Sequence, residues 1–466
     1  MVNALLSAIS GLLLFSGFAP IGFWPGPLLG IALLFHTLCE KYFRQRMLLS
    51  FLSGLTLFLP LLHWSSVYVG STPWLVLAIG ESAIFALIGV MRWHRRWESA
   101  LSFAALFTLI ELLRMKWPFG GFGWGRLGFT QLDSASALYP MIGVTGVSLF
   151  IALAAFISIS WRKSLTLFLF FFFFSFLFSN FTTVENVPRT LQVTAVQGGV
   201  DQLGLDFNNR ALRVLERHVN ATRLISGTDL YVWPENASDV DPLSNERANE
   251  LITTLVSRLG SPLLIGAVEN GSSGPENSSL LFAPDGKVQS RYIKQDLAPF
   301  GEYIPVRKMA EAVSPYAKSV RDFLPGTQWV KHNISGIPFQ SLICFEVLDD
   351  DHAKAGTKGS SFVVAQTNNA TFGRSHEASQ QLQITRARAA ESGRDFVVVS
   401  TTGFTSHLDS RGNIIEIAPQ FTSEALTMKI RVINAETETL AQKLNSSMWI
   451  FGLLAAIAAL GIRIRR

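Results

Sequence analysis

The chain contains few cysteines and few charged residues. Only two of its 466 residues are cysteine, and Asp, Glu, Lys and Arg together make up 16%. Two cysteines do not form a disulfide framework, and no CxxC, HExxH or Cys/His spacing typical of a zinc site is present. We therefore expect neither a disulfide-stapled fold nor a metal centre, and nothing in the sequence calls for a cofactor.

The missing charge is replaced by apolar residues. Hydrophobic residues make up 49% of the chain, including 36 Phe and 11 Trp. Soluble domains average about 25% charged residues, so part of this chain is expected to lie in lipid. Several of the apolar segments fall short of the roughly 20 residues that cross a bilayer. The expected spans are Leu5–Phe18, Leu28–Leu38, Leu48–Leu62, Trp74–Val90, Ala100–Leu113, Tyr139–Ser160, Leu165–Phe181 and Met448–Ile462.

Basic residues are concentrated in alternate loops between these spans. The loops "APIGFWPGP" and "HWSSVYVGSTP" carry no Lys or Arg, whereas the other loops carry Lys41, Arg44, Arg46, Arg92, Arg95, Arg96, Arg162 and Lys163. Because basic loops stay on the cytoplasmic side, the N-terminus is expected inside and the end of the seventh span outside. The mildly basic loop 114–133 opposes this topology weakly, and the terminal "RIRR" agrees with eight spans.

The composition changes at about Glu185. Residues 190–440 alternate β-rich runs such as "LQVTAV", "LYVW", "LLIGAV", "SLICFEV", "FVVAQ" and "FVVVST" with segments of helical spacing, which predicts an α/β domain. The expected organisation is therefore a membrane domain at 1–184, an outward-facing α/β domain at 185–445 and a final transmembrane helix with a basic cytoplasmic tail at 446–466.

The two cysteines are expected on opposite sides of the membrane. Cys39 falls near the cytoplasmic end of a span, and Cys344 falls in the outer domain, so they cannot pair. A lone cysteine in an oxidising compartment is a liability unless it is buried or reactive. Taken by itself, the apolar run "SLICFEV" favours a buried packing residue.

Glu235 and Lys294 change this interpretation. Each lies at the end of a predicted strand, in "YVWPE" and "RYIK", as Cys344 does in "SLIC". A thiol with a pKa of about 8.5 needs a base and a positive neighbour before it can attack. A partly buried Glu can take the proton, and a Lys, with a backbone N–H such as that of Phe345, can stabilise an oxyanion. Singly, each residue is more simply a solvated or packing side chain.

The same segments resemble a known family. The order Glu–Lys–Cys in the contexts "WPE", "K…PFGEY" and "ICFE" resembles the nitrilase superfamily. With spans before and after the domain, "LAPFGEYIP" and "GFGWGRLGFTQ…GVTGVSLF" are similar to its membrane branch, the bacterial apolipoprotein N-acyltransferases. The resemblance implies an αββα sandwich beside a bundle of about eight spans. It implies Glu235 as general base, Lys294 as transition-state stabiliser and Cys344 as nucleophile, supported by Glu302, Phe345 and Glu346.

The resemblance also implies an activity. An acyl chain would pass from a membrane phospholipid, through a thioester on the enzyme, to the N-terminal amine of a diacylglyceryl-cysteine apolipoprotein, without nucleic acid or cofactor. The protein would be a monomer in the bacterial inner membrane, with its catalytic domain in the periplasm. Three segments depart from the family pattern: "VQGGVDQLGLDFNN" lacks the usual Lys-Trp ending, Thr371 replaces an aromatic residue, and "STTGFT" is atypical.

Other functions remain open from the residues alone. A membrane-tethered amidase or nitrilase would use the same three residues on a small soluble substrate. A transporter or scaffold with a binding domain is disfavoured, because the spans carry few ionisable residues beyond Glu81 and Glu111. The GxGxxG match at Gly123–Gly128 lies in an aromatic loop between two spans, without the flanking strand and helix of a dinucleotide site. We interpret it as a lipid-facing or lipid-binding loop.

Overall fold

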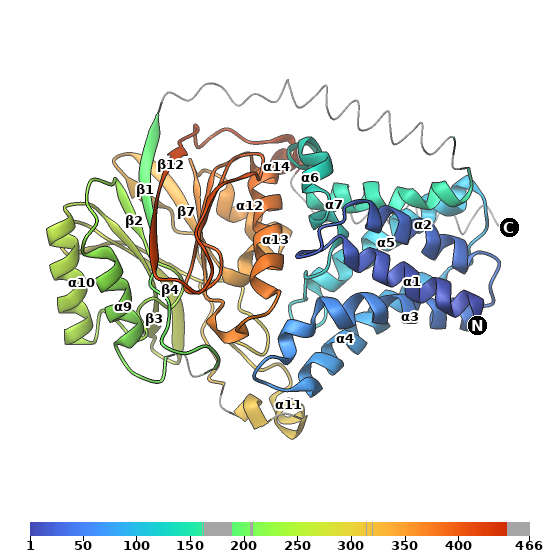
Figure 1. The fold of residues 1–466 in the computed structure, drawn as a ribbon, viewed down its shortest axis with the longest axis horizontal. Helices are drawn as coiled ribbons and strands as arrows, with labels where there is room; N and C mark the ends of the chain where they lie inside the picture. Colours follow the sequence, from blue (N-terminus) through green and yellow to red (C-terminus); the bar gives the residue numbers. More distant parts are fainter. Residues whose placement is uncertain (161, 163–188, 206–207, 314, 319, 445–466) are drawn as a thin grey trace. The chain divides into compact units, whose positions relative to one another are not determined.

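The structure is a computed structural model, and it describes residues 1–160, 162, 189–205, 208–313, 315–318 and 320–444. The chain divides into two compact units, one of Met1–Thr183 with Leu440–Arg466 and the other of Val184–Thr439 (Figure 1). Each unit has its own set of secondary-structure elements, the first helical and the second mixed.

The first unit is built from helices. Its α-helices are α1 (Val2–Ser16), α2 (Pro25–Leu38), α3 (Phe43–Leu61), α4 (Ser71–Phe85), α5 (Trp97–Lys116), α6 (Leu132–Ala135), α7 (Tyr139–Ala152) and α14 (Leu440–Lys443). Its 3₁₀ helices are η1 (His63–Ser66), η2 (Ala86–Val90), η3 (Leu127–Phe129), η4 (Ser136–Leu138) and η5 (Leu153–Ser158). Each of the first six expected apolar segments overlaps one of these helices. The expected segments Leu165–Phe181 and Met448–Ile462 lie outside the described residues.

Two helical stretches of the described residues, Ser71–Val90 and Leu132–Ser158, are long and apolar enough to cross a membrane, judged by length and composition. The helices Val2–Ser16 and Pro25–Leu38 are apolar but shorter. Close packing between α1 and α3 uses small residues. A Cβ on Gly11 would lie 2.1 Å from the Ser53 carbonyl oxygen, and the Ser10 and Ser53 hydroxyls are 2.9 Å apart. Small residues of this kind let helix backbones approach each other.

The aromatic loop between α5 and α7 is folded against its own unit. Trp124 and Leu127 are buried, whereas Trp117 and Phe119 are exposed. The Leu127 amide donates to a Glu111 carboxylate oxygen at 2.7 Å, so a buried acceptor holds the loop. The interpretation of the whole loop as lipid-facing is therefore wrong for its second half, since those side chains fill the interior of the helical unit.

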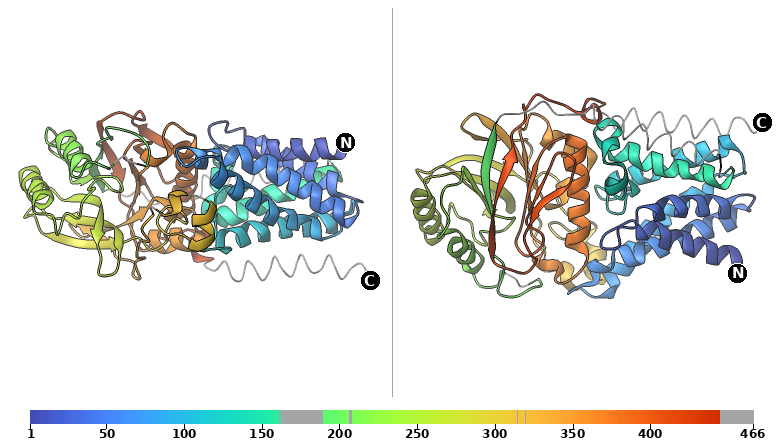
Figure 2. Two further views of the ribbon diagram at one scale, coloured as in Figure 1. Left: turned by 90° about the horizontal axis from the view of Figure 1, so that it is seen from below. Right: turned by 45° about the horizontal axis from the view of Figure 1, so that its top comes forward.

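The second unit is a four-layer αββα sandwich (Figures 1 and 2). One sheet has the strand order β12-β1-β2-β3-β4-β5, and the other has the order β11-β10-β9-β8-β7-β6. The first sheet contains β1 (Thr190–Gln197), β2 (Leu230–Val232), β3 (Leu263–Asn270), β4 (Pro275–Phe282), β5 (Val288–Ile293) and β12 (Glu424–Arg431). The second contains β6 (His332–Ile334), β7 (Ile337–Ile343), β8 (Val363–Thr367), β9 (Phe396–Ser400), β10 (Ser406–Leu408) and β11 (Ile414–Ile417).

Helices cover the outer face of each sheet. The helices α9 (Arg213–Thr222) and α10 (Glu246–Leu259) lie on the first sheet, and α12 (Asp350–Thr357) and α13 (Glu377–Ser392) lie on the second (Figure 1). Helix α11 (Arg307–Val313) and the 3₁₀ helix η6 (Pro315–Lys318) follow β5 in the chain, and η7 (Cys344–Val347) and η8 (Ala370–Phe372) follow β7 and β8. The αββα architecture expected for this domain is confirmed.

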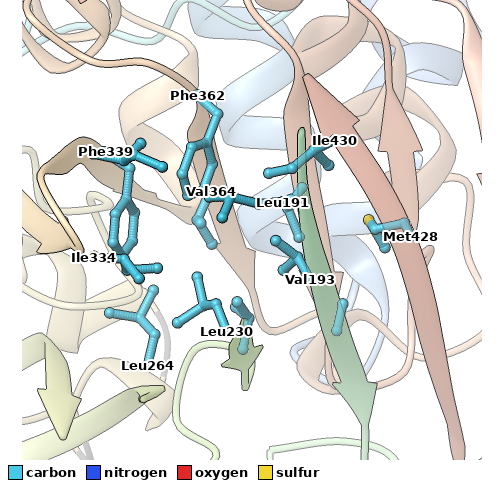
Figure 3. Close-up of a cluster of buried hydrophobic side chains, with 14 of the residues drawn as sticks. Leu191, Val193, Leu230, Leu264, Ile334, Phe339, Phe362, Val364, Met428 and Ile430 are labelled. Carbon is cyan, nitrogen blue, oxygen red and sulfur yellow. The ribbon is translucent and has the colours of Figure 1, made fainter. Parts of the chain in front are cut away.

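The core lies between the two sheets (Figure 3). Side chains alternate along each strand, because successive Cβ atoms point to opposite faces of a sheet. On β2, Leu230 and Val232 enter this inner core, whereas Tyr231 and Trp233 face α9 and α10. From the opposite sheet, the rings of Phe339 and Phe362 stack at 4.8 Å between centroids. Strands β1, β2 and β3 are parallel to one another, as are β7, β8 and β9. The C-terminal ends of the parallel strands therefore meet at one edge of each sheet. Polar residues that follow these ends in the chain are brought close together there.

Candidate active site

Glu235 lies immediately beyond β2. Pro234 ends the strand, since it has no backbone N–H to donate to a neighbouring strand, and Asn236 turns the chain with φ +56°. On the adjacent β3, a Cβ at Gly266 would lie 2.3 Å from the Pro234 carbonyl oxygen. Glycine is thus needed for the two backbones to approach this closely. From the other sheet, the Thr401 hydroxyl donates to the Glu235 carbonyl oxygen at 3.3 Å.

Lys294 lies one residue beyond β5 and contacts two of the three carboxylates predicted for the site, Glu302 and Glu235. Its Nζ is 2.7 Å from Glu302 Oε2 and 3.4 Å from Glu235 Oε1. All three side chains are buried, Lys294 with only 1% of its surface exposed. Asn277 on β4 joins them, because its Nδ2 donates to Glu235 Oε1 and to Glu302 Oε1, each at 2.8 Å. The amide and the ammonium together hold the two carboxylates side by side.

Burial and the neighbouring charges both change the pKa values of Glu235 and Lys294. Burial raises the pKa of Glu235, the Lys294 ammonium opposes that shift, and the Glu302 carboxylate adds to it. Burial acts against the charge on Lys294, but Glu302 and Glu235 outweigh it and hold the pKa of Lys294 well above its usual range. Lys294 is therefore a permanent cation, whereas Glu235 is a carboxyl that binds a proton more readily than an exposed glutamate does.

Cys344 has a backbone conformation that the sequence does not predict. The expected strand ends at Ile343, and Cys344 begins η7 with φ +50°. A side chain other than Gly in this left-handed region is uncommon and costs about 1–3 kcal/mol. The thiol is half-buried, and Gln381 Nε2 on α13 lies 3.5 Å from its Sγ. The sharp turn carries the side chain out of the strand direction.

Glu346 ties this turn to the Lys294 segment. Its Oε2 accepts from the Ile343 amide at 2.8 Å. Its Oε1 accepts from the Tyr292 hydroxyl at 2.6 Å and from the Gln295 amide at 2.8 Å. Tyr292 and Gln295 flank Lys294, so one fully buried carboxyl joins the end of β5 to the end of β7. Burial raises the pKa of Glu346 to about 6.

The predicted residues act on a common sulfur atom. Burial raises the pKa of Cys344 well above its usual range; Glu235 adds to that shift and Lys294 opposes it. The thiol is therefore protonated at rest, and its attack on a substrate requires transfer of the proton to a base. Phe345, next in η7, is half-buried. Of the predicted residues, Glu235, Lys294 and Glu302 act electrostatically on the thiol, Glu346 holds the turn at Cys344, and Phe345 adjoins the thiol in the chain.

Four further polar residues of this site escaped prediction. Asn369 Nδ2 donates to Glu377 Oε2 at 2.7 Å and to Gln381 Oε1 at 2.8 Å. Because the Gln381 side-chain oxygen accepts this bond from Asn369, the Gln381 amide nitrogen is the group that faces Cys344. The Ser400 hydroxyl donates to Asn369 Oδ1 at 2.5 Å. The sequence signal for Asn369, Glu377 and Gln381 was the polar loop "TNNATFG" leading into a helix, and it gave no partner for any of them. Ser400 ends a separate apolar strand and had no such signal.

The raised pKa of Glu377 makes the stability of the protein depend on pH, and this dependence can be measured. Burial raises the pKa of Glu377 to about 8, although its hydrogen bond from Asn369 works against the shift. An unfolded Glu has a pKa of about 4.3, so the folded state binds the extra proton between these values. The stability contributed by this group is full below about pH 4 and declines as pH rises towards 8. We expect Glu377→Gln to be more stable than wild type by an increasing margin between pH 5 and 8.

The measurement is the thermal unfolding midpoint of purified protein at intervals from pH 5 to 9. Glu250→Gln, an exposed carboxylate on α10 paired with Arg247, is the matched control and should show no such pH-dependent difference. A constant difference between Glu377→Gln and wild type at all these pH values would contradict the assigned protonation.

The arrangement is suited to nucleophilic chemistry at a carbonyl. It combines a protonated thiol, a carboxyl able to take its proton and a fixed cation within one buried cluster. Within the described residues, no group of three or more His, Cys, Asp or Glu side chains is arranged to hold a metal ion.

Comparison with known proteins assigns both units to families. Residues 10–157 match the family model of the apolipoprotein N-acyltransferase N-terminal domain, and residues 192–437 match that of carbon–nitrogen hydrolases. Proteins named apolipoprotein N-acyltransferase include one from Mycolicibacterium smegmatis, 31% identical over 91% of this chain and 79% of its own length. Another, from Geobacter metallireducens, is 28% identical over 93% of this chain and 90% of its own length.

Solved structures are similar over the second unit. A CN-hydrolase superfamily protein from Xanthomonas campestris has a TM-score of 0.40 and 15% identity, and covers 57% of this chain and 95% of its own. A variant of a nitrilase-superfamily amidase from Nesterenkonia has a TM-score of 0.41 and 16% identity, and covers 57% of this chain and 99% of its own. On the family models and the curated relatives, the chain belongs to the apolipoprotein N-acyltransferases, a family of acyltransferases whose second unit is a carbon–nitrogen hydrolase domain.

Proposed function

We propose that this enzyme transfers an acyl chain from a membrane phospholipid to the N-terminal amine of a diacylglyceryl-cysteine apolipoprotein. The observation that carries the proposal is the convergence of Cys344, Glu235 and Lys294 in a chain whose relatives are named apolipoprotein N-acyltransferases. A thioester is energetic enough to acylate an amine, so the reaction needs no nucleotide. The acyl group would be carried on Cys344.

In the first half-reaction the Cys344 sulfur attacks the ester carbonyl of the phospholipid. Glu235 takes the thiol proton as the carbon–sulfur bond forms, and this matches a carboxyl whose pKa is raised by burial. The carbonyl oxygen becomes an oxyanion, which Lys294 and the Phe345 backbone N–H stabilise. When the intermediate collapses, the carbon–oxygen bond breaks and the glycerol oxygen takes the proton from Glu235. The products are a thioester on Cys344 and a lysophospholipid.

In the second half-reaction the α-amine of the apolipoprotein attacks the thioester carbonyl. Glu235 accepts a proton from the amine nitrogen while Lys294 again stabilises the oxyanion. The carbon–sulfur bond then breaks, and the departing sulfur recovers its proton from Glu235. An amide is formed and the thiol is regenerated. Glu302 and Asn277 hold Lys294 and Glu235 in place, and Glu346 holds the Cys344 turn beside them.

The membrane arrangement is part of the proposal. Residues 1–184 would form a membrane domain of about seven spans, 185–445 the catalytic domain and 446–466 a final span with a cytoplasmic tail. The multi-pass protein would lie in the bacterial inner membrane as a monomer with its catalytic domain in the periplasm. The alternation of basic and uncharged loops supports this topology, and so does the helical first unit. Both substrates carry acyl chains, and a membrane enzyme would meet them in the bilayer.

The proposed reaction can be tested with purified full-length protein. It is incubated with phospholipid carrying a labelled acyl chain and with a synthetic diacylglyceryl-cysteine lipopeptide. We expect labelled N-acyl lipopeptide and lysophospholipid in equal amounts. A membrane-tethered amidase or nitrilase would instead pass the acyl group to water. Labelled free fatty acid, released equally fast with and without lipopeptide, would therefore refute the transferase proposal.

A further inference from the structure

A polar cavity lies in the α/β unit, built from segments that the proposed chemistry does not use. Its volume is about 160 Å³, and its walls include Asp201, Arg217, Arg374, Thr402 and Phe421. These residues come from the loop after β1, from α9, from the loop before α13, and from segments that follow β9 and precede β12. A single water needs only about 10–15 Å³ of such space, so the cavity has room for a group considerably larger than water.

Its position connects it with the candidate active site. Thr402 follows Thr401, whose hydroxyl donates to the Glu235 carbonyl oxygen at 3.3 Å. The loop after β1 is tied to η8 by a hydrogen bond from the Gly204 amide to the Ala370 carbonyl oxygen at 2.9 Å. Ala370 follows Asn369 of the network beside Cys344. The cavity walls thus belong to the same segments that position the site. They also contain the loop after β1 and the "STTGFT" segment, both of which depart from the family sequence pattern.

The charge on the cavity wall favours an anion. Arg217 is held by Asp201 at 2.9 Å and by the Gly198 carbonyl oxygen at 3.1 Å. Asp201 also pairs with Arg213 at 2.7 Å, so its single negative charge is shared by two guanidinium groups. Arg374 lies over the Phe421 ring with its central carbon 4.3 Å from the centroid. Among the described residues no carboxylate pairs with Arg374. Its guanidinium is therefore oriented by the ring and can still donate hydrogen bonds.

Thr402 supplies a second, independent indication of a ligand. Its side chain is 2% exposed, and its hydroxyl has no hydrogen-bond partner among the described residues. A buried hydroxyl left in this state costs about 1–3 kcal/mol. The residue itself is well fixed, because its carbonyl oxygen accepts from the Phe421 amide at 3.0 Å. A ligand oxygen in the cavity would satisfy the hydroxyl and face Arg374 at the same time.

We propose that this cavity binds a phosphate group, and that within the proposed function this is the phosphodiester of the phospholipid donor. Arginine guanidinium groups recognise phosphate oxygens through paired, charge-assisted hydrogen bonds, and a hydroxyl donor beside them completes such a site. Binding of the head group here would orient the donor while its ester reaches Cys344. Free inorganic phosphate shares this chemistry, so the experiment must separate the two sources.

The test compares two acyl donors with the same chain on full-length protein. One is a phospholipid, and the other is a p-nitrophenyl ester, which has no phosphate. The rate of formation of the acyl-enzyme is measured against donor concentration. Because a hydrogen bond to a charged group is worth about 1.5–3 kcal/mol, we expect Arg374→Gln to raise the KM for phospholipid roughly tenfold to a hundredfold. The p-nitrophenyl ester should react as with wild type, and Arg374→Lys should restore part of the loss.

Controls distinguish the possible failures. Arg247→Gln, an exposed arginine on α10, should leave both donors unaffected. Thr402→Val should weaken phospholipid alone, in the same direction as Arg374→Gln. Equal KM values for phospholipid in Arg374→Gln and wild type would overturn the inference while leaving the proposed function intact. Absence of acyl-enzyme from either donor in wild type would instead refute the proposed function on which the inference rests.

Inorganic phosphate tests the source of the ligand. We expect it to compete with phospholipid in wild type at millimolar concentration, but not in Arg374→Gln. Inhibition that is equal for phospholipid and for the p-nitrophenyl ester would mean that the cavity takes a free anion, and would overturn the head-group assignment. An Arg374→Gln effect on the KM of the lipopeptide acceptor, with donor kinetics unchanged, would overturn it as well, because the cavity would then face the acceptor.

Discussion

Replacing Cys344 with alanine is expected to abolish the acyl-enzyme and to reduce transfer by roughly a thousandfold or more, as loss of a catalytic nucleophile does in other acyl-transfer enzymes. Glu235 and Lys294 both act electrostatically on the Cys344 thiol. Alanine has no side-chain group that could carry the acyl chain. The measurement is labelling of the protein by acyl-labelled phospholipid, followed by release with neutral hydroxylamine, which cleaves thioesters. Wild type should lose its label, and Cys344→Ala should never acquire it.

Two matched variants sharpen this test. Cys39→Ala removes the other cysteine, which belongs to the helical unit, and should be labelled as wild type is. Cys344→Ser should react slowly and give an oxygen ester that neutral hydroxylamine releases poorly. Stable folding of Cys344→Ala is expected, because the half-buried thiol has one weak hydrogen-bond partner, Gln381, at 3.5 Å. Hydroxylamine-labile label on Cys344→Ala equal to that on wild type would show that another residue carries the acyl group.

The elements that could be predicted are those whose signal is local. The runs that became β2, β3, β8 and β9 are largely apolar because both faces of a central strand are buried. Glu235 stands out because it is the first charged residue after such a run, and Lys294 because it follows directly on the strand segment "RYI". Apolar helices in the first unit were found for a similar reason, since hydropathy needs no knowledge of contacts. In each case the physical cause lies within a few consecutive residues.

The contacts that complete the site could not be predicted in this way. Asn277 lies within β4 and has no marker in its own segment; its importance comes from carboxylates supplied by two other segments. Glu346 resembles an ordinary polar residue at a strand end, yet it joins β5 to β7. Cys344 follows an apolar run that predicts continued strand, and its left-handed turn is stabilised by the Glu346 hydrogen bond to Ile343. These are properties of the packed pair of sheets.

Lys294→Met is expected to have the second large effect, on stability and activity together. Lys294 is the cation bound to Glu302 at 2.7 Å and to Glu235 at 3.4 Å in an almost fully buried cluster. Removing one partner of a buried ion pair costs about 3–5 kcal/mol, because it leaves an uncompensated charge. Burial would then raise the pKa of Glu235 without the opposing ammonium. The stability deficit relative to wild type should therefore grow as pH rises above about 4.5, where the unfolded carboxyl ionises.

The matched control is Lys287→Met. Lys287 lies on the same β4–β5 hairpin. Its exposed Nζ is as far as 3.7 Å from the nearest carboxylate oxygen of Asp285, so this ion pair is loose. Surface pairs of this kind contribute about 0–1 kcal/mol, so neither the unfolding midpoint nor acyl-enzyme formation should change appreciably. A comparable loss in Lys287→Met would indicate a general effect of charge on this hairpin.

A double variant separates the two roles of Lys294. In Lys294→Met with Glu302→Gln, the cation and the carboxylate nearest to it are removed together, and Asn277 can still donate to the glutamine oxygen. We expect part of the lost stability to return, because fewer unpaired charges stay buried. Acyl-enzyme formation should remain undetectable, since the Lys294 ammonium no longer stabilises the oxyanion. In addition, the pKa of Glu235 is no longer lowered by that ammonium, so Glu235 releases its proton less readily. Recovery of labelling along with stability would refute the catalytic role of Lys294 and leave it a structural one.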